Sequence, residues 1–272
     1  DFDGGSVMLY NGTEWGTLSF TKTIPDAPTI GTAVAGNAQA TVPFTEPSSN
    51  GGSAITSYTA TSSPGGITGT ISQSGSGDIT VTGLTNGTSY TFTVTATNAI
   101  GTSLASSASN SVTRAIAIGD TYQGGIVFYV DGSGGGLIAA PSDQSSGAAW
   151  GCAGTLITGA DGTAIGTGSQ NTSDIVNGCS TSGIAAKICA DYTDGTYTDW
   201  FLPSKDELSL MYDNIGKGNA LGLGNIGNFS DNYYWSSTEY GSSRAWEQNF
   251  DYGAQYRDPK DVARNVRAVR AF

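Results

Sequence analysis

The chain has 272 residues, 40 of them glycine, and only 12% of its residues are charged. This length suggests two modules, and the composition indicates strands and turns rather than helices. The net charge of −12 argues against a general binder of nucleic acid or of anionic membranes. Because the chain contains no histidine, Ser-His and Cys-His nucleophilic pairs and the usual zinc and copper ligands are excluded.

The first 24 residues contain the stretch "SVMLYNGTEWGTLSF". Two short strands, 7–10 and 14–20, flank Asn11-Gly12, which is typical of a type I′ hairpin turn. The chain opens inside a strand without an initiator Met, and it shows neither a signal peptide nor an apolar run of membrane-span length. We therefore expect residues 1–24 to be a β-hairpin at the end of an upstream module of a longer or processed protein.

Residues 25–115 have the pattern of an all-β sandwich. After the Pro-rich joint "IPDAP", apolar residues alternate at period two, and turn signals such as "SSNGGS" and "TNGT" punctuate the runs. The segment resembles a fibronectin type III domain, through Pro28 at its entry, Phe44 where the family usually places Trp, Tyr58, and the run from Leu84 through Tyr90. The resemblance implies that the Tyr90 hydroxyl is tied back to the chain near Leu84. It also implies a spacer role.

Three cysteines, Cys152, Cys179 and Cys189, lie in the last module without Cys-x-x-Cys spacing. We expect a Cys152–Cys179 disulfide and one buried thiol, with three reduced thiols as the alternative. A disulfide favours an oxidising, extracellular setting.

Residues 116–272 are predicted to form a mixed α+β domain. Two apolar strands, 126–130 and 137–140, are joined by "DGSGGG", and a polar loop extends to about residue 170. The stretch "TSDIVNGCSTSGIAAKICADY" has helical composition. In "PSKDELSLMYDNIG", Ser204 and Glu207 form a capping box and Gly216 ends the helix. Three strands follow, in "YYWSSTEY", "RAWEQNFDYG" and "ARNVRAVRAF".

Several stretches of this module resemble the C-terminal domain of bacterial collagen-like adhesins. They are "GDTYQGGIVFYVDGSGGGLIAAPSDQS", "DWFLPSKDEL", "YWSSTEY", "AWEQNF" and "VRAVRAF". The resemblance implies a C-type-lectin-like α+β fold, similar to the variable receptor-binding proteins of phages. It also implies recognition and adhesion, often toward carbohydrate, at a bacterial cell surface or in a phage virion.

The aromatic stretch 233–258 holds the candidate ligand site. Trp246, Gln248 and Phe250 fall at period two, so they share a strand face, which we expect to be buried together with Trp235. The opposite face and the turns combine Tyr, Ser, Asn and Arg, a mixture typical of paratopes and suited to stacking on sugar rings. The expected ligand-binding residues are Tyr240, Ser243, Arg244, Glu247, Asn249, Asp251, Tyr252, Gln255, Tyr256 and Arg257. A contact between subunits, or solvated turns, are the alternatives.

The closing "RNVRAVR" places three arginines, Arg264, Arg267 and Arg270, near a terminal strand. We expect them to pair with carboxylates, and capture of an anionic ligand is the alternative. The candidate partners are Asp206, Glu207 and Glu239.

No stretch has the ligand spacing of a dedicated calcium loop. We therefore expect no cofactor; the turns "VDGSGG" and "NFDYG" keep Ca²⁺ open as the alternative. No pair of carboxylates has the context of a glycosidase, so we expect no enzyme.

The sequence thus predicts a multidomain protein, a fibronectin III sandwich followed by an α+β C-type-lectin-like domain. The expected function is non-enzymatic recognition or adhesion by a secreted, cell-surface or virion protein that binds cell-surface carbohydrate or a receptor. We expect a homo-oligomer, with a trimer among the options, and neither nucleic-acid binding nor membrane insertion. The alternative is a structural fibre, filament or capsid-decoration subunit whose aromatic surface packs on sister subunits.

Overall fold

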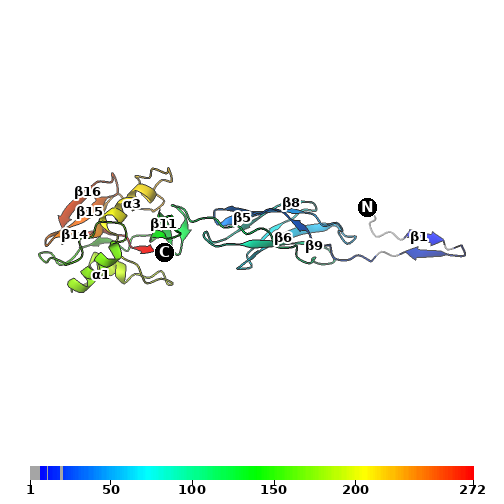
Figure 1. Ribbon diagram of the computed structural model, residues 1–272, viewed down its shortest axis with the longest axis horizontal. Helices are drawn as coiled ribbons and strands as arrows, with labels where there is room; N and C mark the ends of the chain where they lie inside the picture. The colour runs from blue at the N-terminus through cyan, green and yellow to red at the C-terminus, as the bar shows by residue number, and fades with distance from the viewer. Residues whose placement is uncertain (1–6, 11, 19–20) are drawn as a thin grey trace. The chain divides into compact units, whose positions relative to one another are not determined.

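The computed structural model describes residues 7–10, 12–18 and 21–272, and the chain divides into two compact units, Asp1–Ala115 and Ile116–Phe272 (Figure 1). Near the start, β1 (Val7–Tyr10) and β2 (Trp15–Leu18) pair antiparallel. In the turn between them Gly12 has φ +96°, a conformation that suits glycine because it lacks a Cβ. Asn11, the other residue of the predicted turn, lies outside the described residues.

Seven strands of the first unit form two sheets that enclose one core. They are β3 (Thr29–Ile30), β4 (Val34–Gly36), β5 (Gln39–Thr45), β6 (Ile55–Ser63), β7 (Thr68–Ile71), β8 (Gly77–Thr82) and β9 (Thr91–Asn98). One sheet has the order β3-β5-β4 with β8 also paired to β5, and the other has the order β7-β6-β9. Alternate residues of β5, β6, β8 and β9 are buried, as expected when one face of each strand packs on the core.

Two aromatic residues of this core match their predicted roles. The Tyr90 hydroxyl accepts a hydrogen bond from the Thr85 main-chain N–H at 3.1 Å, which confirms the tie back to the chain beside Leu84. The Phe44 ring lies 4.2 Å from the Tyr58 ring, centroid to centroid, between the two sheets. Phe44 therefore supplies core packing where the family usually has Trp.

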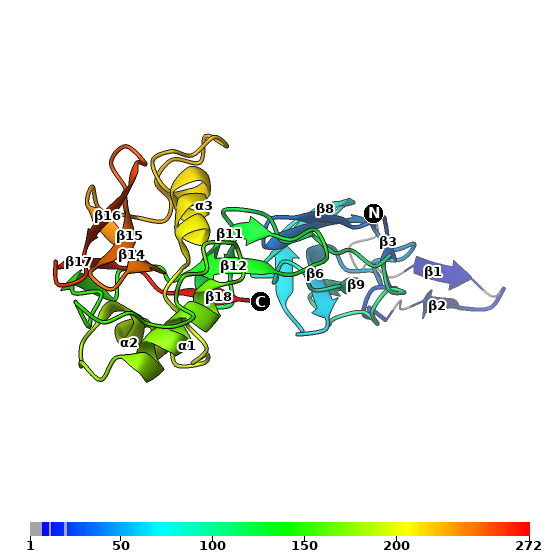
Figure 2. The ribbon, with the colours of Figure 1, turned by 60° about the vertical axis from the view of Figure 1, so that its left-hand side comes forward.

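The second unit contains two sheets and three helices. Its strands are β10 (Thr121–Tyr122), β11 (Gly125–Val130), β12 (Gly136–Ala139), β13 (Ser145–Ala148), β14 (Tyr233–Gly241), β15 (Arg244–Asn249), β16 (Gln255–Pro259), β17 (Arg264–Val266) and β18 (Val269–Ala271). Its helices are α1 (Gly168–Gly178), α2 (Ala185–Ala190) and α3 (Lys205–Ile215). The sheet orders are β10-β11-β12-β18 and β13-β17-β14-β15-β16. Within this unit, α1 and α2 lie on one side and α3 on the other, with β12 and β18 between them (Figure 2).

Two expectations about these elements need correction. The segment "TSDIVNGCSTSGIAAKICADY" belongs to two helices, because Cys179 is extended and Gly183 has φ +69°, which interrupts the helical backbone. The segment "ARNVRAVRAF" splits into β17 and β18, which belong to different sheets. The chain changes sheets at Arg267, whose buried guanidinium donates to the main-chain carbonyls of Ala140 and Gly227.

The helix predicted from the capping box is confirmed. The Ser204 hydroxyl accepts from the Glu207 N–H, and the Glu207 carboxylate accepts from the Ser204 N–H at 2.7 Å. The apolar face of α3 is buried through Leu208, Met211 and Ile215. Within the described part of the chain, no helix is long and apolar enough to cross a membrane.

Candidate functional site

The candidate site lies on the antiparallel meander β14–β15–β16, where β16 is the edge strand of its sheet. Residues of these strands and of β17 border an open depression of about 710 Å³. The lining residues are Tyr233, Tyr240, Arg244, Trp246, Glu247, Gln255, Tyr256, Arg257, Asp258 and Arg264. Register pairs Trp246 with Arg257 and Glu247 with Tyr256. Because successive side chains of a strand point to opposite faces, the lining divides into two surfaces.

The first surface is an aromatic–cationic platform, which we define as the lining residues Tyr240, Trp246, Arg257 and Arg244 together with the neighbouring Lys205 of α3. The rings of Tyr240 and Trp246 meet edge to face with centroids 5.8 Å apart. The Arg257 guanidinium lies 4.4 Å from the Tyr240 centroid and 5.3 Å from the Trp246 centroid. The Lys205 ammonium lies 4.9 Å from the Trp246 centroid. Cations at these distances are attracted to the ring quadrupoles.

Trp246 therefore corrects a prediction. Gln248 and Phe250 are buried as expected, and the Gln248 amide donates to the Gly253 carbonyl at 3.1 Å. Trp246 is only partly buried, because the aliphatic and charged side chains of Lys205 and Arg257 cover its ring in place of an apolar core. Period two alone could not reveal this, since one of the covering residues, Lys205, comes from α3, which is distant in sequence.

Two of the three cations of the platform, Arg244 and Arg257, lack a carboxylate partner among the described residues. Both arginines are exposed. Arg244 donates to the Arg257 carbonyl at 3.1 Å, which holds the two side chains at the same edge of the sheet. Lys205 has only the exposed Asp206 carboxylate, at 3.6 Å. This surface is positive although the chain as a whole is acidic.

Gln255 holds Lys205, the platform residue contributed by α3, in place. Its side-chain amide donates to the Lys205 carbonyl at 2.9 Å and to the Gln248 side chain at 3.2 Å. The Lys205 N–H in turn donates to the Thr238 hydroxyl at 2.9 Å. These bonds fix the start of α3 against β14 and β16, so that the Lys205 side chain extends over Trp246. Gln255 was predicted to contact ligand, and in the structure its amide is engaged by the protein itself.

The second surface is a tyrosine cluster, defined as the lining residues Tyr233 and Tyr256 together with the neighbouring Tyr252. The Tyr252 hydroxyl lies 3.3 Å from that of Tyr233 and 3.4 Å from that of Tyr256. Hydrogen bonding to Tyr233 and then to Tyr256 raises the pKa of Tyr252 above its usual range. Tyr252 and Tyr256 are exposed, as predicted.

Beside this cluster, Arg264 forms ion pairs with Glu247 and Asp258 and lies over the Tyr233 ring. Glu247 is buried, so the expectation that it is exposed is wrong, and burial raises the pKa of its carboxyl. Beside the tyrosine cluster, the cation Arg264 and the anions Glu247 and Asp258 therefore pair with one another.

Three other predicted residues occupy the turns of the meander. Asn249 is buried because its side-chain oxygen accepts the main-chain N–H groups of Asp251 and Tyr252, so it shapes the turn. Asp251 is exposed and pairs with Lys217 at 3.0 Å. Ser243 is exposed, and its main-chain carbonyl accepts the Lys260 N–H at 3.1 Å.

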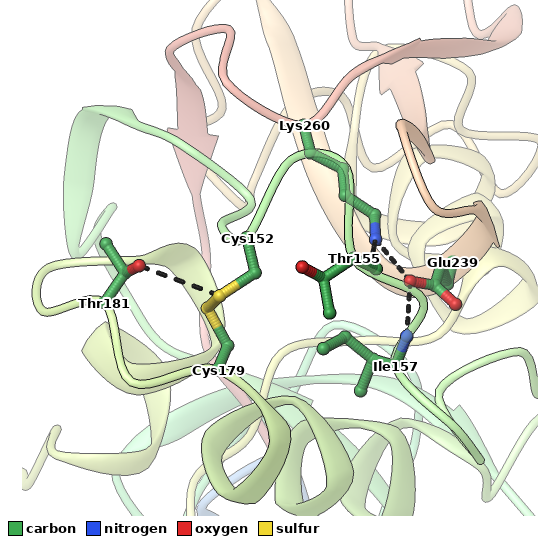
Figure 3. Close-up of a disulfide and its surroundings, with 7 residues drawn as sticks. All are labelled: Cys152, Thr155, Ile157, Cys179, Thr181, Glu239 and Lys260. Atoms are coloured by element: carbon green, nitrogen blue, oxygen red, sulfur yellow. Dashed lines mark hydrogen bonds and ion pairs between the residues drawn. A yellow bond between two sulfur atoms is a disulfide. The ribbon is translucent and has the colours of Figure 1, made fainter.

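A disulfide and a buried ion pair to Glu239 of β14 hold one loop of the C-terminal unit (Figure 3). Cys152 and Cys179 are bonded, as expected, and Cys189 is a free, buried cysteine. Lys260 is fully buried against the Trp150 ring, where it pairs with Glu239 and donates to the Thr155 carbonyl at 2.8 Å. These contacts fix residues 152–157.

The three C-terminal arginines pair with carboxylates, as predicted, but with different partners. Arg264 pairs with Glu247 and Asp258, Arg267 with Asp143, and Arg270 with Asp199. Glu239 and Glu207 are used elsewhere, by Lys260 and by the α3 cap. In the described residues no group of three or more carboxylates or cysteines is arranged to hold a metal ion. Asp131 of the "VDGSGG" turn instead accepts N–H groups of Ser133 and Gly135.

Lys205, Trp246 and Tyr233 belong to the site although the sequence did not indicate them as site residues. Lys205 follows a predicted N-cap, so its place at the start of α3 was foreseeable, but its contact with β15 was not. Tyr233 could not be told apart from a core residue in the sequence, because it is the first residue of the aromatic stretch and is followed directly by the buried Tyr234.

Comparison with known proteins places both units. Residues 26–112 match the fibronectin type III domain, and residues 141–270 match the Lcl C-terminal domain. No curated protein matches the chain.

Similar solved structures include titin kinase with its flanking domains, at 28% identity over 34% of this chain and 17% of that one, with a TM-score of 0.29. They also include the twitchin kinase region of C. elegans, at 24% identity over 34% and 17%, with a TM-score of 0.30. A third is the chicken CNTN1 FN1-FN3 structure, at 21% identity over 34% and 33%, with a TM-score of 0.30. The chain spans at most a third of the length of these three. On the two domain matches, the chain combines a fibronectin type III domain with an Lcl C-terminal domain.

Proposed function

We propose that the C-terminal unit is a non-enzymatic recognition module that binds cell-surface carbohydrate, or a glycosylated receptor, on the aromatic–cationic platform. The observation that carries the proposal is that Tyr240 and Trp246 are held together under Arg257 and Lys205, and that Arg244 and Arg257 have no carboxylate partner among the described residues. The match to the Lcl C-terminal domain supports an adhesin-like module.

The chemistry of the platform suits a saccharide. The exposed Tyr240 ring, held against Trp246, offers rigid apolar area to the C–H face of a sugar ring at little cost in conformational entropy. Guanidinium groups donate in a planar fork that matches hydroxyl pairs and acid groups of a glycan. We infer further that the unit is of the C-type-lectin-like kind and that it works outside the cell, at a bacterial surface or in a virion. The disulfide is consistent with an oxidising setting.

A glycan array with matched tyrosine variants tests the proposal. Tyr240→Ala and Arg257→Ala remove the platform, whereas Tyr252→Ala removes an equally exposed tyrosine from the other surface. We expect the two platform variants to weaken binding of any glycan hit at least roughly tenfold, the loss typical of a central interface residue. Tyr252→Ala should bind like the unchanged protein. Equal binding by all three variants, or the absence of any glycan hit, would contradict the proposal.

A structural role in a fibre, filament or capsid decoration is the second candidate. The tyrosine cluster favours this role, because its tyrosines are exposed and the neighbouring charges of Arg264 and Glu247 already pair with each other. Interfaces between proteins are typically rich in tyrosine and poor in unpaired charge. Light scattering of the full chain distinguishes the two. In the structural case a stable oligomer forms and Tyr252→Ala dissociates it, while Tyr240→Ala does not.

A further inference from the structure

The strand β16 is the last of its sheet, so it has an open edge along which no other strand is paired. Two main-chain bonds at the ends of the β15–β16 pair determine which of its residues face this edge. They run from the Asn249 N–H to the Ala254 carbonyl at 2.9 Å, and from the Lys260 N–H to the Ser243 carbonyl at 3.1 Å. Residues bonded across an antiparallel pair alternate with residues whose main-chain groups point away from it. Gln255, Arg257 and Pro259 therefore direct their main-chain groups to the open edge.

Most of these outward groups have no partner. In the part of the chain that the structure describes, the N–H groups of Gln255 and Arg257 and the Gln255 carbonyl make no hydrogen bond. Pro259 has no N–H to satisfy, which is why proline is tolerated at an edge. The Arg257 carbonyl accepts from the Arg244 guanidinium at 3.1 Å. A proline and a charged side chain at an edge strand hinder its pairing with sheet edges of other molecules.

The depression of about 710 Å³ lies on both sides of this edge. Trp246 and Arg257 border it on the face of the aromatic–cationic platform, and Glu247, Tyr256 and Asp258 border it on the face of the tyrosine cluster. A ligand stacked on one face of the sheet contacts only one of these sets. A strand added to β16 contacts both, because its successive side chains alternate between the two faces.

The charges of the two faces indicate which strand fits. On the platform face, Arg244 and Arg257 lack a carboxylate partner among the described residues, whereas Arg264 on the other face is paired with Glu247 and Asp258. Opposite charges directly across an antiparallel pair stabilise it, and like charges destabilise it. An added strand should therefore carry acidic residues on the platform face and uncharged residues on the other. A second copy of β16 would bring arginines against arginines.

We propose that β16 is a docking edge for an extended acidic segment of a partner polypeptide, which adds antiparallel to the sheet as a further strand. The acidic residue opposite Arg257 exchanges two main-chain hydrogen bonds with it, and its carboxylate pairs with the guanidinium. Arg244 then releases the Arg257 carbonyl and turns to a carboxylate of the added strand. This deepens the proposed function by naming how the polypeptide of a glycosylated receptor is held, and it rests on that function only for the receptor.

A synthetic peptide tests the docking edge. The probe is a fluorescein-labelled, end-capped peptide in which Glu and Thr alternate, titrated with the full chain and followed by fluorescence anisotropy. We expect it to bind, and to bind more weakly as salt screens the arginines. A peptide in which Lys and Thr alternate is the charge control and should not bind. Failure of the Glu peptide to bind, or equal binding of the two, would overturn the proposal.

Methylation of the peptide nitrogens separates strand pairing from attraction of charges. In the proposed register the residues opposite Arg257 and Gln255 are the acidic ones, so their N–H groups are those that face β16. N-methylation of every Glu should therefore weaken binding at least about tenfold, because more than one main-chain hydrogen bond is lost. N-methylation of every Thr, whose N–H groups face away, should leave binding unchanged. Equal affinities of the two methylated peptides would contradict strand pairing.

Two substitutions at Arg257 make the same separation on the protein. Arg257→Ala removes the guanidinium and keeps the N–H, whereas Arg257→Pro removes both and leaves the bonds to β15 intact, because this N–H points away from β15. Arg257→Pro should bind the Glu peptide at least about fivefold more weakly than Arg257→Ala, the worth of one main-chain hydrogen bond. Equal affinities of the two variants for the peptide would count against the docking edge.

If Arg257→Pro does not fold, amide exchange in the unchanged chain decides the question. The amides of Gln255 and Arg257 should exchange faster than those of Tyr256 and Asp258, which are bonded to β15, and the peptide should slow them at least about tenfold. Exchange that the bound peptide leaves unchanged would contradict the proposal.

The same variants distinguish this proposal from the proposed function. A glycan on the platform does not use the edge N–H, so Arg257→Ala and Arg257→Pro should lose glycan binding equally. Glycan binding without a peptide that pairs with β16 would overturn the docking edge alone, and peptide binding without a glycan hit would overturn the carbohydrate proposal alone. Light scattering tests for a second copy on the edge: a dimer that Arg257→Ala keeps and Arg257→Pro loses would also overturn the proposal.

Discussion

At the scale of single residues, Lys260 is the position where a change matters most for stability. Its side chain is inaccessible to solvent, and Glu239, its partner, is also buried. Removing one member of such a pair leaves an uncompensated buried charge, so Lys260→Met should cost about 3–5 kcal/mol of unfolding free energy. Urea unfolding of the Trp15→Phe background, followed by tryptophan fluorescence, measures this in the C-terminal unit, because the other four tryptophans all lie there.

The double variant Lys260→Met/Glu239→Gln is the control for that prediction. It removes both charges, and Gln keeps an acceptor for the Ile157 N–H, which donates to Glu239 at 2.9 Å. Most of the lost stability should return, since a buried ion pair and a neutral pair of similar volume are often equally stable. A double variant as unstable as the single one would show that the ammonium stabilises through Thr155 and Trp150 instead.

Residue patterns predicted the site only in part. Tyr240, Arg244 and Arg257 lie together as expected, because Tyr240 and Arg244 flank the turn between β14 and β15, and Arg257 lies beside them on the edge strand β16. Glu247 was expected to be exposed and is buried, whereas Trp246 was expected to be buried and is only partly so. Alternation predicts which side chains share a face, but a twisted sheet with helices packed around it decides how deeply each face is covered. That depth depends on Arg264 and Lys205, which are distant in sequence.

At the scale of elements, the Ser204–Glu207 capping box does more than begin α3. The buried Glu207 carboxylate accepts from Ser204 and from Gly166, which precedes α1, and thereby joins two helix starts. The capping box could be predicted from the sequence because Ser204 and Glu207 are only three positions apart. The bond to Gly166 was not, because it spans 41 positions.

The Glu207 carboxyl should give α3 a measurable pH dependence. Burial raises its pKa above the ordinary value of 4.5, although the N–H donors of Ser204, Gly166 and Gly168 oppose the shift. The folded state therefore holds the proton more tightly than the unfolded state, and stability falls as pH rises from about 4.5 through the raised pKa. Urea unfolding of the unchanged chain and of Glu207→Gln across this window measures the difference. The unchanged chain should lose stability relative to the variant as pH rises, and a gain would contradict the assignment.

At the scale of the whole molecule, the two units have separate cores, and this separation should be visible in calorimetry. The core of the sandwich and the two apolar clusters of the C-terminal unit share no residue. The pattern change near residue 115 indicated such a division because each segment contains its own set of apolar strands. The assignment of strands to the two sheets of the second unit could not be predicted in the same way, since β17 and β18 lie in one continuous stretch, "ARNVRAVRAF", with no turn signal between them.

Reduction of the disulfide tests that separation. Cys152 and Cys179 are 27 positions apart, and closing a loop of this length stabilises a fold by roughly 3–4 kcal/mol in the chain-entropy model. Reduction, or Cys152→Ser/Cys179→Ser, should therefore lower the unfolding temperature of the C-terminal unit while the transition of the sandwich stays in place. If both transitions moved together, the units would stabilise each other.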